Sequence, residues 1–119
     1  MDSTTLELLE FIDKSIKLIK DRFSKIDSVD DFLADDSGLE KLDSISMRIQ
    51  AIGESVKNLY KRDLELLLSV GNSDYWSKII RARDFISHHY IDLNAEIVYD
   101  ICANEIEILE IKITQLIGR

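Results

Sequence analysis

The stretch LDSISMRIQAIGESVKNL, residues 42–59, determines the fold class because its apolar side chains recur in alternating steps of three and four. This spacing places them on one face of an α-helix. They are Leu42, Ile45, Ile49, Ile52, Val56 and Leu59. Further leucines and a valine continue the face to residue 70, which predicts a helix over about residues 39–70. Gly53 costs this helix about 1 kcal/mol relative to alanine, so we expect a second helix to approach closely there.

The same apolar spacing recurs on both sides of this segment. It predicts a first helix over about residues 3–25 and a short helical turn over 28–33. The sequence DDSG, residues 35–38, is typical of a break. A third helix is expected over roughly 74–90, and a fourth over about 92–117. The chain is therefore predicted to be an all-α protein.

The composition favours one folded domain over residues 1–119. The chain is 45% hydrophobic and 32% charged, has no proline and only four glycines, and so has few positions at which a helix must stop. Cys102 is the only cysteine, which excludes an internal disulfide and a thiolate metal site. We expect neither a metal nor a cofactor. Without a leader-like N-terminus or a long apolar run, the expected location is the cytoplasm, with no membrane contact.

The last predicted helix carries more apolar residues than one face can hold. A terminal helix of a monomer has one side against its own core, so the excess indicates a second buried surface. This predicts a homodimer, although a stripe broadened for a deep core explains the pattern nearly as well. The residues are Ile97, Val98, Ile101, Ile106, Ile108, Leu109, Ile111, Ile113, Leu116 and Ile117.

The net charge of −8 argues against nonspecific binding of nucleic acid, because attraction to phosphate supplies most of that affinity. The charge is unevenly distributed, however. Residues 45–90 hold seven Lys and Arg against five Asp and Glu, a net +2, and both histidines lie there. Ordinary variation of the surface would also produce this difference.

The third predicted helix carries most of the polar chemistry of interest. Projection at 100° per residue separates two sets of side chains. The set predicted to face the core is Ile79, Ala82, Phe85, Ile86 and His89. The set predicted to face solvent is Arg83, Asp84, Ser87 and His88.

Within the solvent-facing set, Asp84 precedes His88 by four residues, a spacing at which a carboxylate can orient an imidazole. Tyr90 follows Arg83 by seven residues and so projects close to it. Trp76 is interpreted as a core anchor rather than a platform for stacked bases. By spacing alone, Arg83, His88 and Tyr90 could all be ordinary surface or boundary residues.

The order Arg83, four residues, His88, one residue, Tyr90 resembles the signature of HepT-like proteins, a branch of the HEPN superfamily. An Asp, Asn or His directly after the arginine is usual in that family, and Asp84 agrees. The segment IGESVK, residues 52–57, also resembles the family's mid-helix segment. The resemblance implies an HEPN-type up-and-down bundle of about four to five helices that forms a dimer.

The resemblance also implies a function, that of the toxin of a type II toxin–antitoxin pair. Such proteins are metal-independent endoribonucleases in which the arginine and histidine of two subunits form one cleft. We expect His88 to act as general acid and base, Arg83 to bind the phosphate, and Asp84 to orient His88. The residues expected to bind RNA beside them are Lys78, Arg81 and Ser87.

The implied partner is an antitoxin, a minimal nucleotidyltransferase called MNT, which adds AMP to the motif tyrosine. In this chain that residue is Tyr90. Ala82 departs from the family, which often has methionine there. Two other interpretations remain open. The chain could be a non-catalytic binding partner and substrate of a nucleotidyltransferase, or a structural bundle whose Arg83, His88 and Tyr90 share no cleft.

Overall fold

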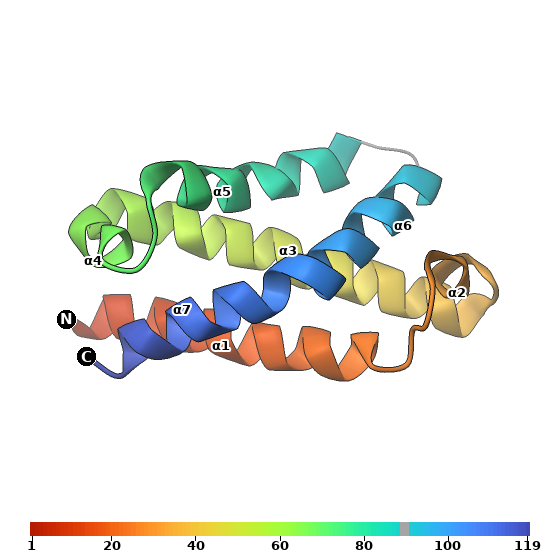
Figure 1. Cartoon of the computed structure of the whole chain (residues 1–119), viewed down its shortest axis with the longest axis horizontal. Helices are drawn as coiled ribbons and strands as arrows, with labels where there is room; N and C mark the ends of the chain where they lie inside the picture. The colour runs from red at the N-terminus through yellow and green to blue at the C-terminus, as the bar shows by residue number, and fades with distance from the viewer. Residues whose placement is uncertain (89–90) are drawn as a thin grey trace.

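The structure, a computed structural model, describes residues 1–88 and 91–119, and for residues 87, 88, 91 and 93 it describes the backbone alone. The described chain is helical, without β-strands, and short turns join its helices (Figure 1). The all-α prediction is therefore confirmed. The elements are α1 (Ser3–Phe23), α2 (Val29–Leu33), α3 (Asp36–Arg62), α4 (Leu64–Leu68), α5 (Ser73–His88), α6 (Ile91–Asp100), the π-helix η1 (Ile101–Glu105) and α7 (Ile106–Ile117).

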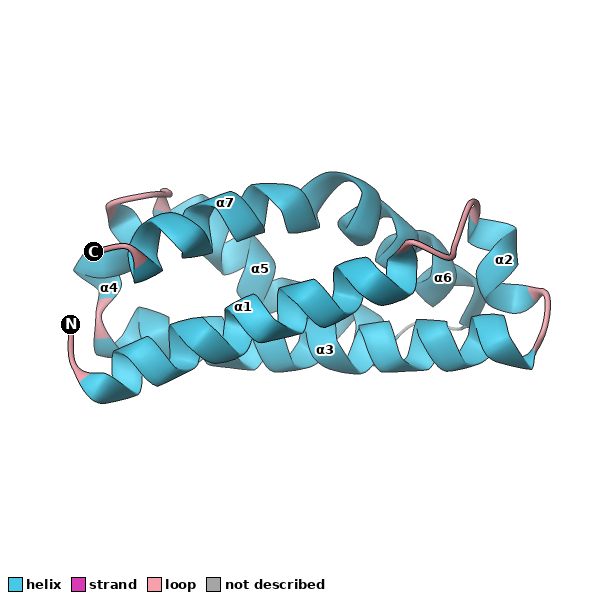
Figure 2. Ribbon diagram, turned by 90° about the horizontal axis from the view of Figure 1, so that it is seen from below, coloured by secondary structure: helices cyan, strands magenta, loops and turns pink. Residues whose placement is uncertain are grey.

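The long helices pack side by side and alternate in direction, as an up-and-down bundle requires (Figures 1 and 2). α1 packs against α3 and α7, and α3 also packs against α5. The bundle is elongated, with extents of 44 × 25 × 20 Å, and the two ends of the chain lie at the same end of it (Figure 1). The predicted bundle architecture is confirmed.

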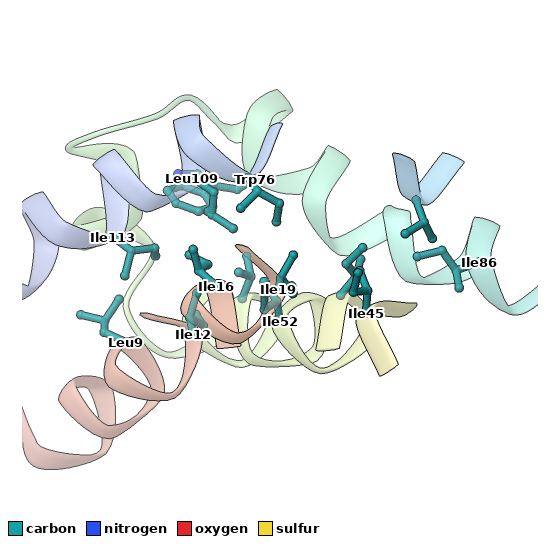
Figure 3. Packing of buried hydrophobic residues seen from close by; sticks show 14 of the residues in the cluster. Leu9, Ile12, Ile16, Ile19, Ile45, Ile52, Trp76, Ile86, Leu109 and Ile113 are labelled. Atoms are coloured by element: carbon teal, nitrogen blue, oxygen red, sulfur yellow. The ribbon is translucent and has the colours of Figure 1, made fainter. Parts of the chain in front are cut away.

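The core is a continuous apolar layer between the long helices. The stripe predicted for residues 42–59 is buried throughout, with no member more than 5% exposed. Side chains from α1, α3, α5 and α7 point into this common interior (Figure 3). Those labelled there include Ile12, Ile16 and Ile19 of α1, Ile45 and Ile52 of α3, Trp76 of α5, and Leu109 and Ile113 of α7.

The predicted limits of the second long helix are wrong at both ends, and aspartates explain both errors. The Asp35 side chain accepts a hydrogen bond from Gly38 N at 2.8 Å, so the expected break is instead the N-cap of α3. Asp63 has a non-helical backbone, with φ −149° and ψ 69°, and its side chain accepts from Leu66 N. It therefore ends α3 and caps α4.

The predicted fourth helix forms one helical path that is interrupted by the π-helix η1. Val98 and Ile106 are both buried in the same core but lie eight residues apart. Two α-helical turns use about 7.2 residues, so the wider π turn keeps both side chains on the buried face. Part of the apolar excess remains outside the core, because Ile108 and Ile111 are 45% and 57% exposed.

None of the helices in the described ranges is long and apolar enough to cross a lipid bilayer. The longest, α3, spans 27 residues, but its exposed side carries charged residues throughout, as expected for a helix with one buried face.

Candidate functional site

The site is organised by the contact between α3 and α5 at Gly53. A Cβ atom built on Gly53 would lie 3.4 Å from the carbonyl oxygen of Ile79 and 3.5 Å from Cβ of Arg83. The backbone of α5 therefore lies directly against α3 at this point. The close helix–helix approach predicted for Gly53 is confirmed, and it brings the stem of Arg83 beside the residue that follows Gly53, which is Glu54.

The Arg83 guanidinium lies between two carboxylates. Its Nη1 donates to Oε2 of Glu54 on α3, and its Nε lies 3.5 Å from Oδ1 of Asp84. The Arg83 side chain is 31% exposed, against 52% for Glu54 and 63% for Asp84. Ion pairs this exposed contribute at most about 1 kcal/mol to stability, so the contact matters chiefly for where the guanidinium is held.

This position corrects the predicted orientation of α5. Arg83 was expected on the open side of the helix, but it lies half-buried in the seam between α3 and α5. Phe85 was expected in the core and is 54% exposed, whereas Ile86 is 4% exposed, as predicted. The face of α5 that packs against α3 contains Arg83 and Ile86, and the prediction placed this face too far towards Phe85.

Phe85 instead lines a shallow groove between α5 and the segment formed by α6 and η1. Ala82 also lines this groove, and with Ile79 it borders the adjoining apolar cavity beneath it. Lys78 stands at the edge of both, 71% exposed, with Nζ 3.7 Å from Oε1 of Glu105. Arg81 is exposed on the same helix.

Several of the predicted site residues lie outside the described part of the chain. These are the side chains of Ser87 and His88 and the whole of His89 and Tyr90. The structure does describe α5 through the backbone of His88. Five residues of α-helix place it roughly 7.5 Å along the axis beyond Arg83. The expected contacts of His88 with Arg83 and with Asp84, and the position of Tyr90, stay predictions.

Glu54 is the residue that sequence reasoning did not assign. It lies 29 positions before Arg83, so no local spacing connects the two. The signal available was its neighbour Gly53: a helix-interior glycine predicts a close crossing, and a charged residue beside it can reach across that crossing.

Two other polar groups near the bundle interior are poor nucleophiles. Burial raises the pKa of the Cys102 thiol to about 12, so it stays protonated near neutral pH. Burial, with a smaller contribution from the Glu105 charge, raises the pKa of Tyr75 to about 12 as well. Within residues 1–88 and 91–119 no three His, Cys, Asp or Glu side chains are grouped so as to hold a metal ion.

Comparison with known proteins adds independent information. The model of the family described as "Ribonuclease HepT-like" matches residues 12–116. "Putative RNase MJ0127" of Methanocaldococcus jannaschii is 32% identical over 77 residues, which are 65% of this chain and 58% of that protein. The matched region thus spans less than two thirds of that relative's length. No solved structure matches the chain.

Proposed function

The chain belongs to the HepT-like ribonuclease family, and on that premise we propose that it is the endoribonuclease toxin of a toxin–antitoxin pair. The observation that carries the proposal is the Arg83 guanidinium, which α3 and α5 hold together at the surface of a seam, with His88 one and a half turns further along α5. The proposal pairs this guanidinium with the imidazole of His88, since cleavage of RNA needs one group to stabilise charge on the phosphate and one to transfer protons.

RNA supplies its own nucleophile, so the protein need only transfer protons and stabilise charge. The 2′-oxygen attacks the adjacent phosphorus, and the bond from phosphorus to the 5′-oxygen of the next nucleotide breaks. His88 takes the 2′-hydroxyl proton or donates one to the departing oxygen. Arg83 donates hydrogen bonds to the phosphate oxygens as negative charge develops on them. The products carry a 2′,3′-cyclic phosphate and a 5′-hydroxyl.

The remaining predicted residues have supporting roles in this proposal. Lys78, Arg81 and Ser87 lie on the same helix as Arg83 and would contact the RNA backbone on either side of the cleaved bond. Asp84 orients His88 in the proposed mechanism. The 3.5 Å contact between Asp84 and Arg83 Nε is long enough to yield to a phosphate oxygen, which binds a guanidinium through two donors.

We propose that the active form is a homodimer in which the two copies of the motif share one cleft. Phe85 on α5 and Ile108 and Ile111 on α7 are each 45% or more exposed, and burial against a second copy would remove them from water. Two copies also bring two sets of Lys78, Arg81 and Arg83 to the RNA, which offsets the acidic charge of the chain.

We propose that a nucleotidyltransferase antitoxin neutralises the protein by adding AMP to Tyr90. Tyr90 follows Arg83 by seven residues in the sequence. A phosphate-bearing group attached there would compete for the Arg83 guanidinium and repel the RNA backbone.

Digestion of a structured RNA in the presence of a metal chelator tests the nuclease proposal. We expect cleavage to persist in EDTA and every new end to be a 2′,3′-cyclic phosphate paired with a 5′-hydroxyl. End analysis by phosphatase and kinase treatment distinguishes these ends from the 5′-phosphates left by metal-dependent nucleases. Intact RNA, or 5′-phosphate ends, would count against the proposal, and an Arg83→Ala preparation controls for contaminating nuclease.

Native mass spectrometry tests the dimer and the partner together. The free protein is expected at twice the chain mass of 13.7 kDa. After co-expression with the nucleotidyltransferase, each chain should gain AMP-sized increments that are absent from Tyr90→Phe. A single-chain mass, or increments that persist in Tyr90→Phe, would contradict these proposals. Increments on a protein that never cuts RNA would favour a non-catalytic partner and substrate of the transferase.

A further inference from the structure

We propose that Glu54 is a positioning residue for Arg83, whose carboxylate holds the guanidinium in the orientation that meets the scissile phosphate. The inference rests on the proposed ribonuclease function. It assigns Glu54 no contact with RNA. Its role is to act through Arg83, from the opposite side of the α3–α5 seam.

The geometry of the seam makes Glu54 suited to this role. An arginine side chain has a long flexible stem, and ordering it costs rotamer entropy. The absent side chain at Gly53 lets Cβ of Arg83 lie against α3, which fixes the start of the stem. The Glu54 carboxylate then fixes its end by accepting from Nη1. Two points on a second helix therefore define one orientation of the guanidinium.

Asp84 is a weaker candidate for the same role. It is adjacent to Arg83 on one helix, where neighbouring side chains do not face each other, and its contact to Nε is long at 3.5 Å. Its carboxylate is also more exposed than that of Glu54. Glu54 occupies only Nη1 of a guanidinium that has five N–H donors, so holding the side chain through Glu54 is compatible with its proposed contact to phosphate.

Arg83 differs from the cations of the ion pairs that other residues form in the described part of the chain. The cations of those pairs are 45% or more exposed, whereas Arg83 is 31% exposed. The other pairs that join separate helices include Lys20–Glu110, between α1 and α7. That pair has no predicted site residue beside it, so it offers a matched control.

Kinetics of Glu54→Gln test the role directly. The substitution keeps the size of the side chain but removes its charge, so the guanidinium is held less firmly. We expect kcat to fall roughly 10- to 100-fold, the cost of misplacing a catalytic group by up to about 1 Å. KM should stay the same or decrease, because removing a carboxylate near the phosphate does not weaken attraction to RNA. Glu54→Asp, which keeps the charge, should recover part of the lost kcat.

The matched variant Glu110→Gln removes one carboxylate of equal charge from the Lys20 pair and should leave kcat unchanged. A fall in kcat of the same size in Glu110→Gln would assign the effect to net charge and overturn the proposal. So would a Glu54→Gln enzyme with wild-type kcat, or one in which only KM rises.

A second measurement does not depend on nuclease activity. The Nη1–H signal of Arg83, the group that donates to Glu54, can be assigned in an NMR spectrum by its loss in Arg83→Lys. We expect this proton to exchange with water slowly in the wild type and in Glu110→Gln, and faster in Glu54→Gln. If the wild type does not cleave RNA, the proposed function fails while this comparison still decides whether Glu54 holds the guanidinium. Equal exchange in the wild type and Glu54→Gln would overturn the inference.

Discussion

Alanine in place of Arg83 is expected to slow RNA cleavage about 10²- to 10³-fold, the usual effect of removing one donor to developing negative charge. Alanine in place of His88 should slow it about 10²- to 10⁴-fold, because a proton transfer is then left to water. Both rates are measured at saturating RNA, so that weaker binding does not contribute to the difference.

Two variants make the Arg83 result specific. Arg83→Lys keeps the positive charge but loses the planar fork, so we expect it to recover RNA binding and little of kcat. Arg62→Ala removes another arginine that pairs with a carboxylate, Asp2, at the far end of α3, and should cleave at the wild-type rate. If Arg83→Ala cleaved as fast as Arg62→Ala, the guanidinium would have no part in the reaction.

The positions of the helices could be predicted because burial and helical spacing coincide over most of the chain. The apolar steps of residues 42–59 are the same residues that α3 buries, and Ile12, Ile16 and Ile19 likewise form the buried face of α1. The helix ends were less predictable. Asp35 and Asp63 are both N-caps, and an aspartate is equally common in turns, so composition alone does not distinguish a cap from a break.

The sequence motif supplies candidate site residues but not their tertiary contacts. The motif spacing identified Arg83 and Asp84, but which face of α5 meets α3 depends on how the two helices cross. The mean direction of the apolar side chains of α5 pointed towards Phe85, which is exposed. It missed the packed face because that face also includes the half-buried Arg83. A polar residue in the contact between two helices shifts this mean direction away from the packed face. A glycine on the facing helix predicts the position of the contact better.

Alanine in place of Trp76 should lower the free energy of unfolding by about 3–5 kcal/mol, the range for removal of a large buried aromatic. Trp76 is fully buried, and its Nε1 donates to the carbonyl oxygen of Leu67 at 2.8 Å. The side chain therefore joins the start of α5 to α4. The total free energy of unfolding of a native protein is about 5–15 kcal/mol, so the variant should be close to unfolding at physiological temperature.

Urea unfolding measures this change, at one fixed protein concentration because association would shift the midpoint. Circular dichroism is the appropriate probe, since Trp76 is the only tryptophan. Trp76→Phe keeps most of the ring packing and loses one hydrogen bond. We expect the free energy of unfolding to fall by only about 0.5–1.5 kcal/mol, because the Leu67 carbonyl oxygen is not left unpaired: it still accepts from Gly71 N at 3.2 Å.

The control for Trp76→Ala is Met47→Ala on α3. The Met47 side chain is 70% exposed, so this substitution should change the free energy of unfolding by no more than about 0.5 kcal/mol. A loss below about 1 kcal/mol in Trp76→Ala would mean that Trp76 does not anchor α5. The result also bears on the site, because Trp76 precedes Arg83 by seven residues, about two turns of α5, and so lies on the same side of that helix. If Trp76 fixes the position of that side of α5, Trp76→Ala assayed at low temperature, where it is folded, should also lose slow exchange at Arg83 Nη1–H, whereas Met47→Ala should retain it.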